Sequence, residues 1–242
     1  MVTPTQIDSE HALLAAIGPP LHGGQAIALI GGADNLVAAA RARIAPFFRT
    51  LAEALDAAHA VLVDGGTESG VMRLVADARR ETGATFRLIG VVPRGRIGRP
   101  TRGGTVVALA EGHTELLLVP GTKFGDESPW LFRAADHLAG GHASTLVVNG
   151  GRLSLGEAVR RLAAGAPVAA VEGSGRAADA LARALAAGGV FGVPAVPEVD
   201  DQLRPFPAQP VDIARLRVIG LDAGVGDLAV ALRATLEEDQ RT

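Results

Sequence analysis

The chain has 242 residues, a net charge of −3 and no cysteine. This charge excludes a bulk nucleic-acid binder, because a polyanion needs a basic surface, and the missing cysteines exclude disulfides and thiolate metal sites. The apolar runs are too short to span a bilayer, and no signal-peptide pattern opens the sequence. We therefore expect a cytoplasmic protein with a small-molecule partner, no contact with membranes or nucleic-acid polymers, and no metal or cofactor.

Short apolar runs alternate with amphipathic stretches along the chain, which is typical of buried parallel strands joined by crossover helices. The predicted strands are Ala26–Ile30, Ala60–Val63, Arg87–Val92, Glu115–Val119, Thr145–Val148 and Val168–Val171. The predicted helices are Ala38–Ala58, Ser69–Thr82, Pro129–Ala139, Ser154–Ala164, Ser174–Ala187 and Asp227–Glu238. This order predicts the α/β class, a Rossmann-like parallel sheet with helices on both faces, in a single domain.

The pattern is strongest over residues 25–187, which we expect to form the nucleotide-binding core. Residues 1–24 carry too little pattern to assign. Residues 188–242 contain a Gly- and Pro-rich stretch followed by the last predicted helix, and we expect them to pack on the same domain. Ser128 followed by Pro129 fits an N-cap with proline at the first helical position.

The turn after the second predicted strand contains three glycines and two hydroxyl side chains. They are Gly65, Gly66, Thr67, Ser69 and Gly70. Strand ends in a parallel sheet face a shared crevice, and backbone N–H groups at a helix start can cradle a phosphate there. A tight turn in which Thr67 or Ser69 serves as a simple N-cap fits the same residues, so both interpretations stay open.

A second Gly-rich turn, with Gly150 and Gly151, follows the fifth predicted strand. Ser154 and Glu157 have the spacing of a capping box, in which the glutamate accepts the N–H of the N-cap residue. Alternatively, Glu157 lies near a ribose, where it could hold hydroxyls or stabilise an oxocarbenium-like centre. The two roles can coexist at one helix start.

A third turn, with Gly173, Ser174 and Gly175, leads into a helix whose first turn carries Arg176. A cation in the first turn lies at the positive end of the helix dipole, which is unfavourable. A bound anion in front of the helix would offset this repulsion. The simpler alternative is a side-chain pair between Arg176 and Asp179. We favour the anion.

The sequence lacks the motifs of several other activities. The chain has no Gly-x-Ser-x-Gly elbow, no Walker sequence and no histidine pair with metal-ligand spacing. The first predicted strand ends in Gly31-Gly32-Ala33-Asp34 rather than in a G-x-G-x-x-G turn, which argues against ordinary NAD binding there.

Taken together, four segments resemble the SLOG superfamily, and most closely its branch in the N-terminal cytosolic region of melastatin-type TRP channels and in their prokaryotic stand-alone relatives. These segments are VDGGTESGVM at 63–72, LIGVVPRG at 88–95, GHTELLLVPGT at 112–122 and VEGSGRAAD at 171–179. The resemblance implies a Rossmann-like fold that senses or processes nucleotide-derived ligands. In some channels of the group this region binds ADP-ribose-type molecules.

The resemblance also implies roles for particular residues. Gly66, Thr67 and Ser69 would contact phosphate, and Arg176 would pair with the anionic part of the ligand. Arg133 looks like the arginine that relatives carry on the helix before the next strand. Because SLOG relatives often dimerise through helices beside the site, we also expect a homodimer.

A more distant branch, the Lonely Guy phosphoribohydrolases, has the signature Pro-Gly-Gly-x-Gly-Thr-x-x-Glu. The second turn is similar but has Asn149, Leu153 and Ser154 in place of the proline, the third glycine and the threonine, whereas Glu157 is retained. A side chain at Leu153 would obstruct a close backbone approach. We therefore predict a sensor that binds ADP-ribose or a related nucleotide. The alternative is a hydrolase of nucleoside 5′-monophosphates with Glu157 and Arg133 as catalytic residues.

Overall fold

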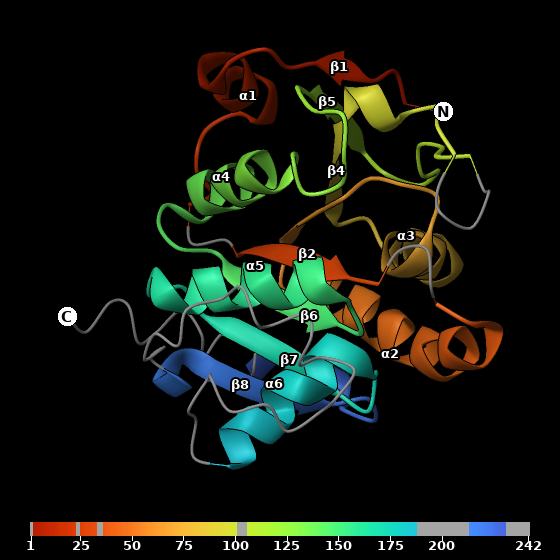
Figure 1. Ribbon diagram of the computed structural model, residues 1–242, viewed down its shortest axis with the longest axis vertical. Coiled ribbons are helices and arrows are strands. Elements are labelled where there is room, and N and C mark those ends of the chain that lie inside the picture. The colour runs from red at the N-terminus through yellow and green to blue at the C-terminus, as the bar shows by residue number, and fades with distance from the viewer. Residues whose placement is uncertain (1, 23–24, 33–35, 101–105, 188–212, 231–242) are drawn as a thin grey trace.

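A computed structural model describes residues 2–22, 25–32, 36–100, 106–187 and 213–230. Within these residues, eight strands form one sheet in which every pair is parallel, in the order β1-β5-β4-β3-β2-β6-β7-β8. The strands are β1 (Thr5–Gln6), β2 (Ala26–Gly31), β3 (Val61–Asp64), β4 (Arg87–Pro93), β5 (Glu115–Val119), β6 (Ser144–Val148), β7 (Val168–Glu172) and β8 (Leu216–Gly220). In Figure 1 the sheet runs from β1 and β5 at the top, through β2, to β8 at the bottom.

Helices cover both faces of the sheet. They are α1 (Glu10–Ile17), α2 (Ala38–Ala57), α3 (Gly70–Thr82), α4 (Ser128–Ala139), α5 (Arg152–Ala163) and α6 (Arg176–Ala186). α2 and α3 pack on one face, and α1, α4, α5 and α6 pack on the other. Two single turns of 3-10 helix lie at Arg94–Arg96 and Ile213–Arg215. The predicted Rossmann-like α/β class, with helices on both faces, is confirmed.

The six predicted strands all form, within one or two residues of the expected bounds. β1 and β8 were not predicted, nor was α1, although Ser9 caps α1 by accepting a hydrogen bond from the N–H of Ala12. β1 and α1 lie before residue 25 and β8 lies after residue 187, and both strands pair in the same sheet as the core. Among the described helices, none combines the length and the apolar character needed to cross a bilayer.

Several helix starts differ from the prediction by one or two residues. α4 begins at Ser128, with Glu127 in the N-cap position and Pro129 in the first turn, so the expected N-cap role of Ser128 is wrong. α6 begins at Arg176, two residues after the predicted Ser174. The last predicted helix starts at Val225 and is helical through residue 230; its remainder, like the Gly- and Pro-rich stretch at 188–210, lies outside the described residues.

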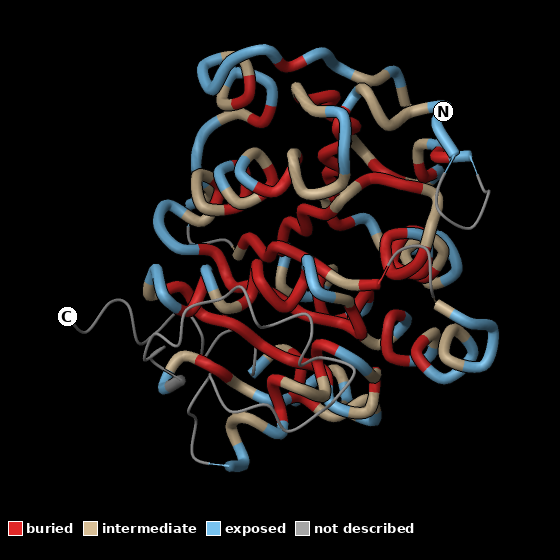
Figure 2. The backbone as a smooth tube through the Cα atoms, in the orientation of Figure 1, coloured by how far each residue is buried: buried red, intermediate tan, exposed pale blue. Residues whose placement is uncertain are grey.

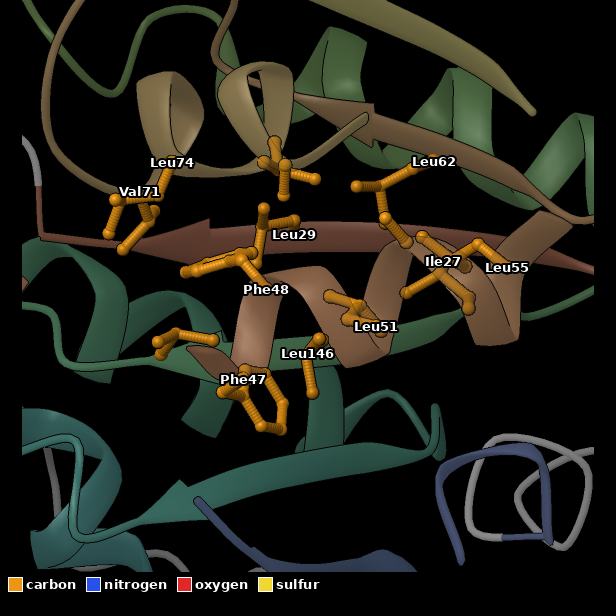
Figure 3. Packing of buried hydrophobic residues seen from close by; sticks show 14 of the residues in the cluster. Ile27, Leu29, Phe47, Phe48, Leu51, Leu55, Leu62, Val71, Leu74 and Leu146 are labelled. Carbon is orange, nitrogen blue, oxygen red and sulfur yellow. The ribbon is translucent and has the colours of Figure 1, made fainter. Parts of the chain in front are cut away.

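The largest part of the core lies between α2 and the centre of the sheet. Phe47, Phe48, Leu51 and Leu55 recur at helical spacing and point toward strand residues such as Leu29 (Figure 3). The two phenylalanine rings pack edge to face, with centroids 5.8 Å apart. Figure 2 shows the result, a band of buried strands beneath helices whose outer turns are exposed. Side chains along each strand point alternately to the two faces of the sheet, and helices cover both faces. Each central strand is therefore a continuous run of apolar residues in the sequence.

α2 contains a proline at its exposed side, Pro46. Proline has no N–H, so the helix lacks the hydrogen bond that residue 46 would donate to the carbonyl of Ala42. Ile44 and Phe47, on either side of it, are nevertheless fully buried. Tertiary packing of these buried side chains therefore keeps the segment helical despite the missing hydrogen bond.

Arg161 on α5 ties two helices and a strand together, although it is almost completely buried. Its guanidinium donates two hydrogen bonds, of 2.7 and 2.8 Å, to the carboxylate of Asp136 on α4. It also donates to the carbonyl of Ala143 and to the hydroxyl of Thr145, and it stacks over the ring of Phe132 at 4.9 Å. A buried arginine with this many partners has a structural role, because each of its three guanidinium nitrogens donates at least one hydrogen bond.

We predict that Arg161→Met destabilises the protein by about 3 kcal/mol, because it leaves Asp136 without its partner in a mostly buried position. Arg160→Met is the matched control, since Arg160 is the exposed neighbour on the same helix, and it should change stability by less than about 0.5 kcal/mol. Denaturant unfolding measures both. Equal effects of the two substitutions would contradict the structural role of Arg161.

Candidate functional site

The direction in which strands are added to the sheet reverses at β2, which lies between β3 and β6. In open parallel sheets, ligands usually bind in the crevice outside the carboxyl ends of the strands at such a point. A cavity of about 80 Å³ lies there, between the ends of β2 and β3 and the first turns of α4 and α5. Its apolar lining residues are Leu29, Ile30, Met72, Phe124, Leu131, Phe132 and Leu153. Gly31 and Gly65 also line it, and its polar lining residues are Thr67, Glu127, Ser128, Ser154 and Glu157.

Two carboxyl groups reach this cavity from different helices. Glu157 on α5 is only 5% exposed and accepts a hydrogen bond from the hydroxyl of Ser128 on α4. Burial raises the pKa of Glu157 to about 7, against the opposing effect of that hydrogen bond, and the nearby Glu127 raises it further. Burial also raises the pKa of Glu127, despite the hydrogen bond that it accepts from the Gly125 N–H. Near neutral pH, the cavity can therefore hold a proton.

The predicted capping box at the start of α5 is wrong. The helix begins at Arg152 with Gly151 in the N-cap position, so Ser154 already lies inside the first turn. The Ser154 hydroxyl donates to the carbonyl of Gly31, and Glu157 turns to Ser128 instead of the backbone. The side chains of Ser154 and Glu157 are thus free of a capping role and face the cavity.

The turn after β3 satisfies part of its own backbone. The N–H of Gly66 donates to Asp64 Oδ1, at 2.8 Å, and the N–H groups of Glu68, Ser69 and Val71 donate to backbone carbonyls. Ser69 is the N-cap residue by position, but its side chain makes no capping bond and instead contacts the Thr67 hydroxyl. Of the five residues predicted here, Gly65 and Thr67 line the cavity, whereas the N–H of Gly66 is already occupied.

A fully buried pair of side chains, Asp64 and His113, packs beneath this turn. Asp64 Oδ1 also contacts Nε2 of His113, at 2.8 Å, and neither side chain is exposed. A Cβ on Gly66 would come within 2.9 Å of Gly90, and Gly66 has a φ of +58°, so glycine is required at this contact. The pair and the glycine contact together fix the wall of the cavity that Gly65 and Thr67 provide.

The turn after β7 is closed in the same way. Asp179 Oδ1 accepts the N–H groups of Gly173 and Gly175, at 2.8 and 3.1 Å. The N–H groups of Ala177 and Ala178, in the first turn of α6, donate to carbonyls of the neighbouring turn after β6. The predicted alternative of an Arg176–Asp179 pair is not present, because the Asp179 carboxylate is turned to the backbone.

The start of α5 leaves a longer consecutive run of N–H groups open than the other two turns do. The N–H groups of Gly151, Arg152, Leu153 and Ser154 have no acceptor within the described part of the chain, and no side chain caps the helix. Arg176 leans over this point from α6, with Nη2 only 3.0 Å from the place where a Cβ on Gly151 would lie. Open N–H groups and a guanidinium together form a typical binding site for an anion.

Arg176 itself is held in an unusual conformation. It is exposed, makes no ion pair with a described carboxylate, and has a φ of +52°, which non-glycine residues rarely adopt. The effect is that its side chain extends toward α5 rather than along its own helix. The expected contact of Arg176 with an anion stays a prediction.

Asn149 joins the turns after β6 and β7. Its N–H donates to the Ser174 hydroxyl and its side-chain amide donates to the Ser174 carbonyl, both at 2.7 Å. Gly150, the next residue, has a φ of +89°, and a Cβ there would strike Ser154. Ser174 is therefore a structural residue of this junction, and Gly150 is required by the close approach of α5.

Arg133 lies away from the other predicted residues. Its guanidinium pairs with Glu10 of α1, at 2.6 Å, and both side chains are about half exposed. It does not line the cavity. Sequence reasoning also missed Glu127, Ser128, Asp64 and His113. A polar residue directly after a strand or before a helix was the available signal for the first three, whereas nothing local marked His113.

No group of three or more potential metal ligands occurs among the described side chains.

Solved structures with the same fold share little sequence with this chain. The structural genomics target TM1055 is 19% identical, with a TM-score of 0.54 over 87% of this chain and 99% of that one. A molybdenum cofactor binding protein from the phototrophic bacterium Rippkaea orientalis is 11% identical, with a TM-score of 0.54 over 87% and 96%. A molybdenum cofactor carrier protein from Chlamydomonas reinhardtii is 16% identical, with a TM-score of 0.52 over 88% and 99%. No curated protein matched the chain.

The sequence itself matches one family over most of its length. The model of the family described as "SLOG in TRPM, prokaryote" aligns with residues 25–201, which include β2 to β7, the cavity and the three Gly-rich turns. This agrees with the resemblance carried by the four sequence segments. The chain belongs to this prokaryotic SLOG family.

Proposed function

We propose that this protein is a binding module for a nucleotide-derived ligand, ADP-ribose or a related nucleotide, and that it acts as a ligand sensor. The observation that carries the proposal is the open start of α5 beside Arg176. In the part of the chain that the structure describes, four N–H groups without acceptors and an arginine without an acidic partner leave a position for a phosphate group. Two solved structures with the same fold are named as molybdenum cofactor proteins, so other proteins with this fold bind ligands.

The ligand has an orientation in this proposal. Leu153 and Ser154, whose N–H groups are among the open ones, line the cavity together with Glu157, so the two places adjoin. The phosphate would lie outside, at the helix start, and the nucleoside part would extend into the cavity. Ser154 and Glu157 would there meet the ribose hydroxyls, while the apolar walls would contact the base.

Calorimetry with ADP-ribose, cyclic ADP-ribose, AMP and NAD tests the proposed function directly. We expect binding of at least one of them with a matching rise in melting temperature. If no member of the panel produced heat or thermal stabilisation at millimolar concentration, nucleotide sensing would be ruled out.

A second candidate, hydrolysis of the N-glycosidic bond of nucleoside 5′-monophosphates, is favoured by Glu157 alone. A buried carboxyl group whose pKa is about 7 can deliver a proton to a leaving base at neutral pH. Arg133, the other residue expected for that reaction, is engaged with Glu10 outside the cavity. Incubation with a panel of nucleoside monophosphates, followed by chromatography, separates the candidates, because only the hydrolase releases free base and ribose 5-phosphate.

We also propose a homodimer formed through helices beside the site, as the family resemblance implies. Light scattering over a range of protein concentrations tests it. A monomer mass at every concentration would exclude it.

Arg176→Ala should weaken nucleotide affinity about ten- to a hundredfold, because it removes a charge-assisted contact of about 1.5–3 kcal/mol. It should leave the melting temperature of the ligand-free protein unchanged or slightly raised, since the cation opposes the dipole of α6. Arg183→Ala, at the exposed far end of the same helix, is the control and should bind normally. Normal binding by Arg176→Ala together with a lower melting temperature would show that Arg176 is a stability residue.

The stability of the protein should depend on the protonation of Glu157. Its folded pKa of about 7 lies above the ordinary value of 4.5, so its contribution is full below pH 4.5 and is lost as the pH rises to 7. A shift of this size corresponds to on the order of 3 kcal/mol. Glu157→Gln should therefore flatten the fall in unfolding free energy between pH 4.5 and 7, as measured by denaturant titration.

Glu172→Gln is the control for this measurement, because Glu172 is an exposed glutamate at the end of β7. Its pH profile should match that of the unmodified protein. If Glu157→Gln also left the profile unchanged, the burial of an ionisable Glu157 would be refuted.

A further inference from the structure

A second arginine reaches the same edge of the sheet from the opposite face. Arg43 lies on α2, which packs on the face away from α5 and α6. Its Nη2 is 3.9 Å from the place where a Cβ on Gly175 would lie, while Nη2 of Arg176 is 3.0 Å from the corresponding place on Gly151. Gly151 and Gly175 are the N-cap residues of α5 and α6. The two guanidinium groups thus lie over adjacent turns.

Within the described residues, neither of these two arginines has an acidic partner. Seven other arginines do pair with carboxylates, namely Arg49, Arg73, Arg80, Arg87, Arg94, Arg133 and Arg161. Arg43 and Arg176, by comparison, make no ion pair or hydrogen bond within the described residues, and both are exposed. The carboxylate on α6 nearest to them in sequence, Asp179, is occupied by backbone N–H groups. Two unpaired guanidinium groups at neighbouring turns attract an anion with more than one charge.

An unsatisfied polar atom lies beside these turns, against the turn after β2. The carboxamide of Asn149, which is 4% exposed, lies between Gly175 and Gly32: Nδ2 is 3.0 Å from the Cβ position of Gly175, and Oδ1 is 2.6 Å from that of Gly32. Oδ1 is buried and has no hydrogen-bond partner. A buried acceptor without a donor costs stability, and a hydroxyl or N–H of a ligand would satisfy it.

We propose that Arg43 and Arg176 together bind a diphosphate, so that the site selects nucleoside diphosphates and their sugar esters over monophosphates. One phosphate lies at the open N–H groups of α5 and contacts Arg176. The second lies toward Gly175 and contacts Arg43. This inference rests on the proposed function, and it adds Arg43 as the residue that distinguishes one phosphate from two.

The test compares AMP, ADP, ADP-ribose, inorganic phosphate and pyrophosphate by calorimetry, for the unmodified protein and for Arg43→Ala, Arg176→Ala and Arg183→Ala. We expect the unmodified protein to bind ADP and ADP-ribose at least tenfold more tightly than AMP. Arg43→Ala should weaken ADP, ADP-ribose and pyrophosphate about tenfold and leave AMP within about twofold. Arg176→Ala should weaken all phosphate ligands, and Arg183→Ala none.

The outcomes separate the two proposals. Equal affinity for AMP and ADP, or an equal loss of both in Arg43→Ala, would overturn the diphosphate site and leave nucleotide binding intact. Binding of pyrophosphate that depends on Arg43, with no binding of any nucleotide, would support the diphosphate site and overturn the proposed function. The melting temperature of Arg43→Ala without ligand shows whether the variant is folded, and a folded variant with unchanged ADP binding would refute the role of Arg43.

Discussion

Backbone N–H groups at the carboxyl edge of the sheet need acceptors, and the way this chain supplies them determines where a ligand can bind. Asp64 supplies one in the turn before α3, and Asp179 supplies two in the turn before α6. The start of α5 has no such carboxylate, and glycine at 150 and 151 keeps that turn free of side chains. The partner that we propose for these N–H groups is an external anion, which would give this turn a different role from the other two glycine-rich turns.

The cavity beside this turn disfavours negative charge, whereas the start of α5 favours it. Its carboxyl groups, Glu127 and Glu157, disfavour a second negative charge, and its other walls are mostly apolar. In the proposed function, a phosphate is therefore favoured at the start of α5 and disfavoured inside the cavity. This contrast would orient an amphiphilic ligand, with an uncharged heterocycle or sugar at one end and phosphate at the other.

The central strands could be predicted because each is a short run of apolar residues buried on both faces. β1 could not, since Thr5 and Gln6 are only two exposed residues. The Ser154–Glu157 spacing was misread because a local pattern does not show that Ser128, 29 residues from Glu157, offers a better partner. The pairing of Asp64 with His113 joins residues 49 apart, and the reach of Arg43 to Gly175 crosses the sheet. Both depend on the tertiary arrangement alone.

Pro46 gives α2 an uneven resistance to local unfolding. The hydrogen bond missing at this residue is one of those that would fasten the first two turns, which carry Arg43, to the long apolar part of the helix that packs on the sheet. The first turns can therefore fray at a lower cost in free energy than the turns beyond Phe47. A bound anion that held Arg43 would suppress this fraying. The amide groups at the start of α2 would then exchange their hydrogens more slowly when an anion is bound. Their exchange rate would therefore indicate whether the anion site is occupied.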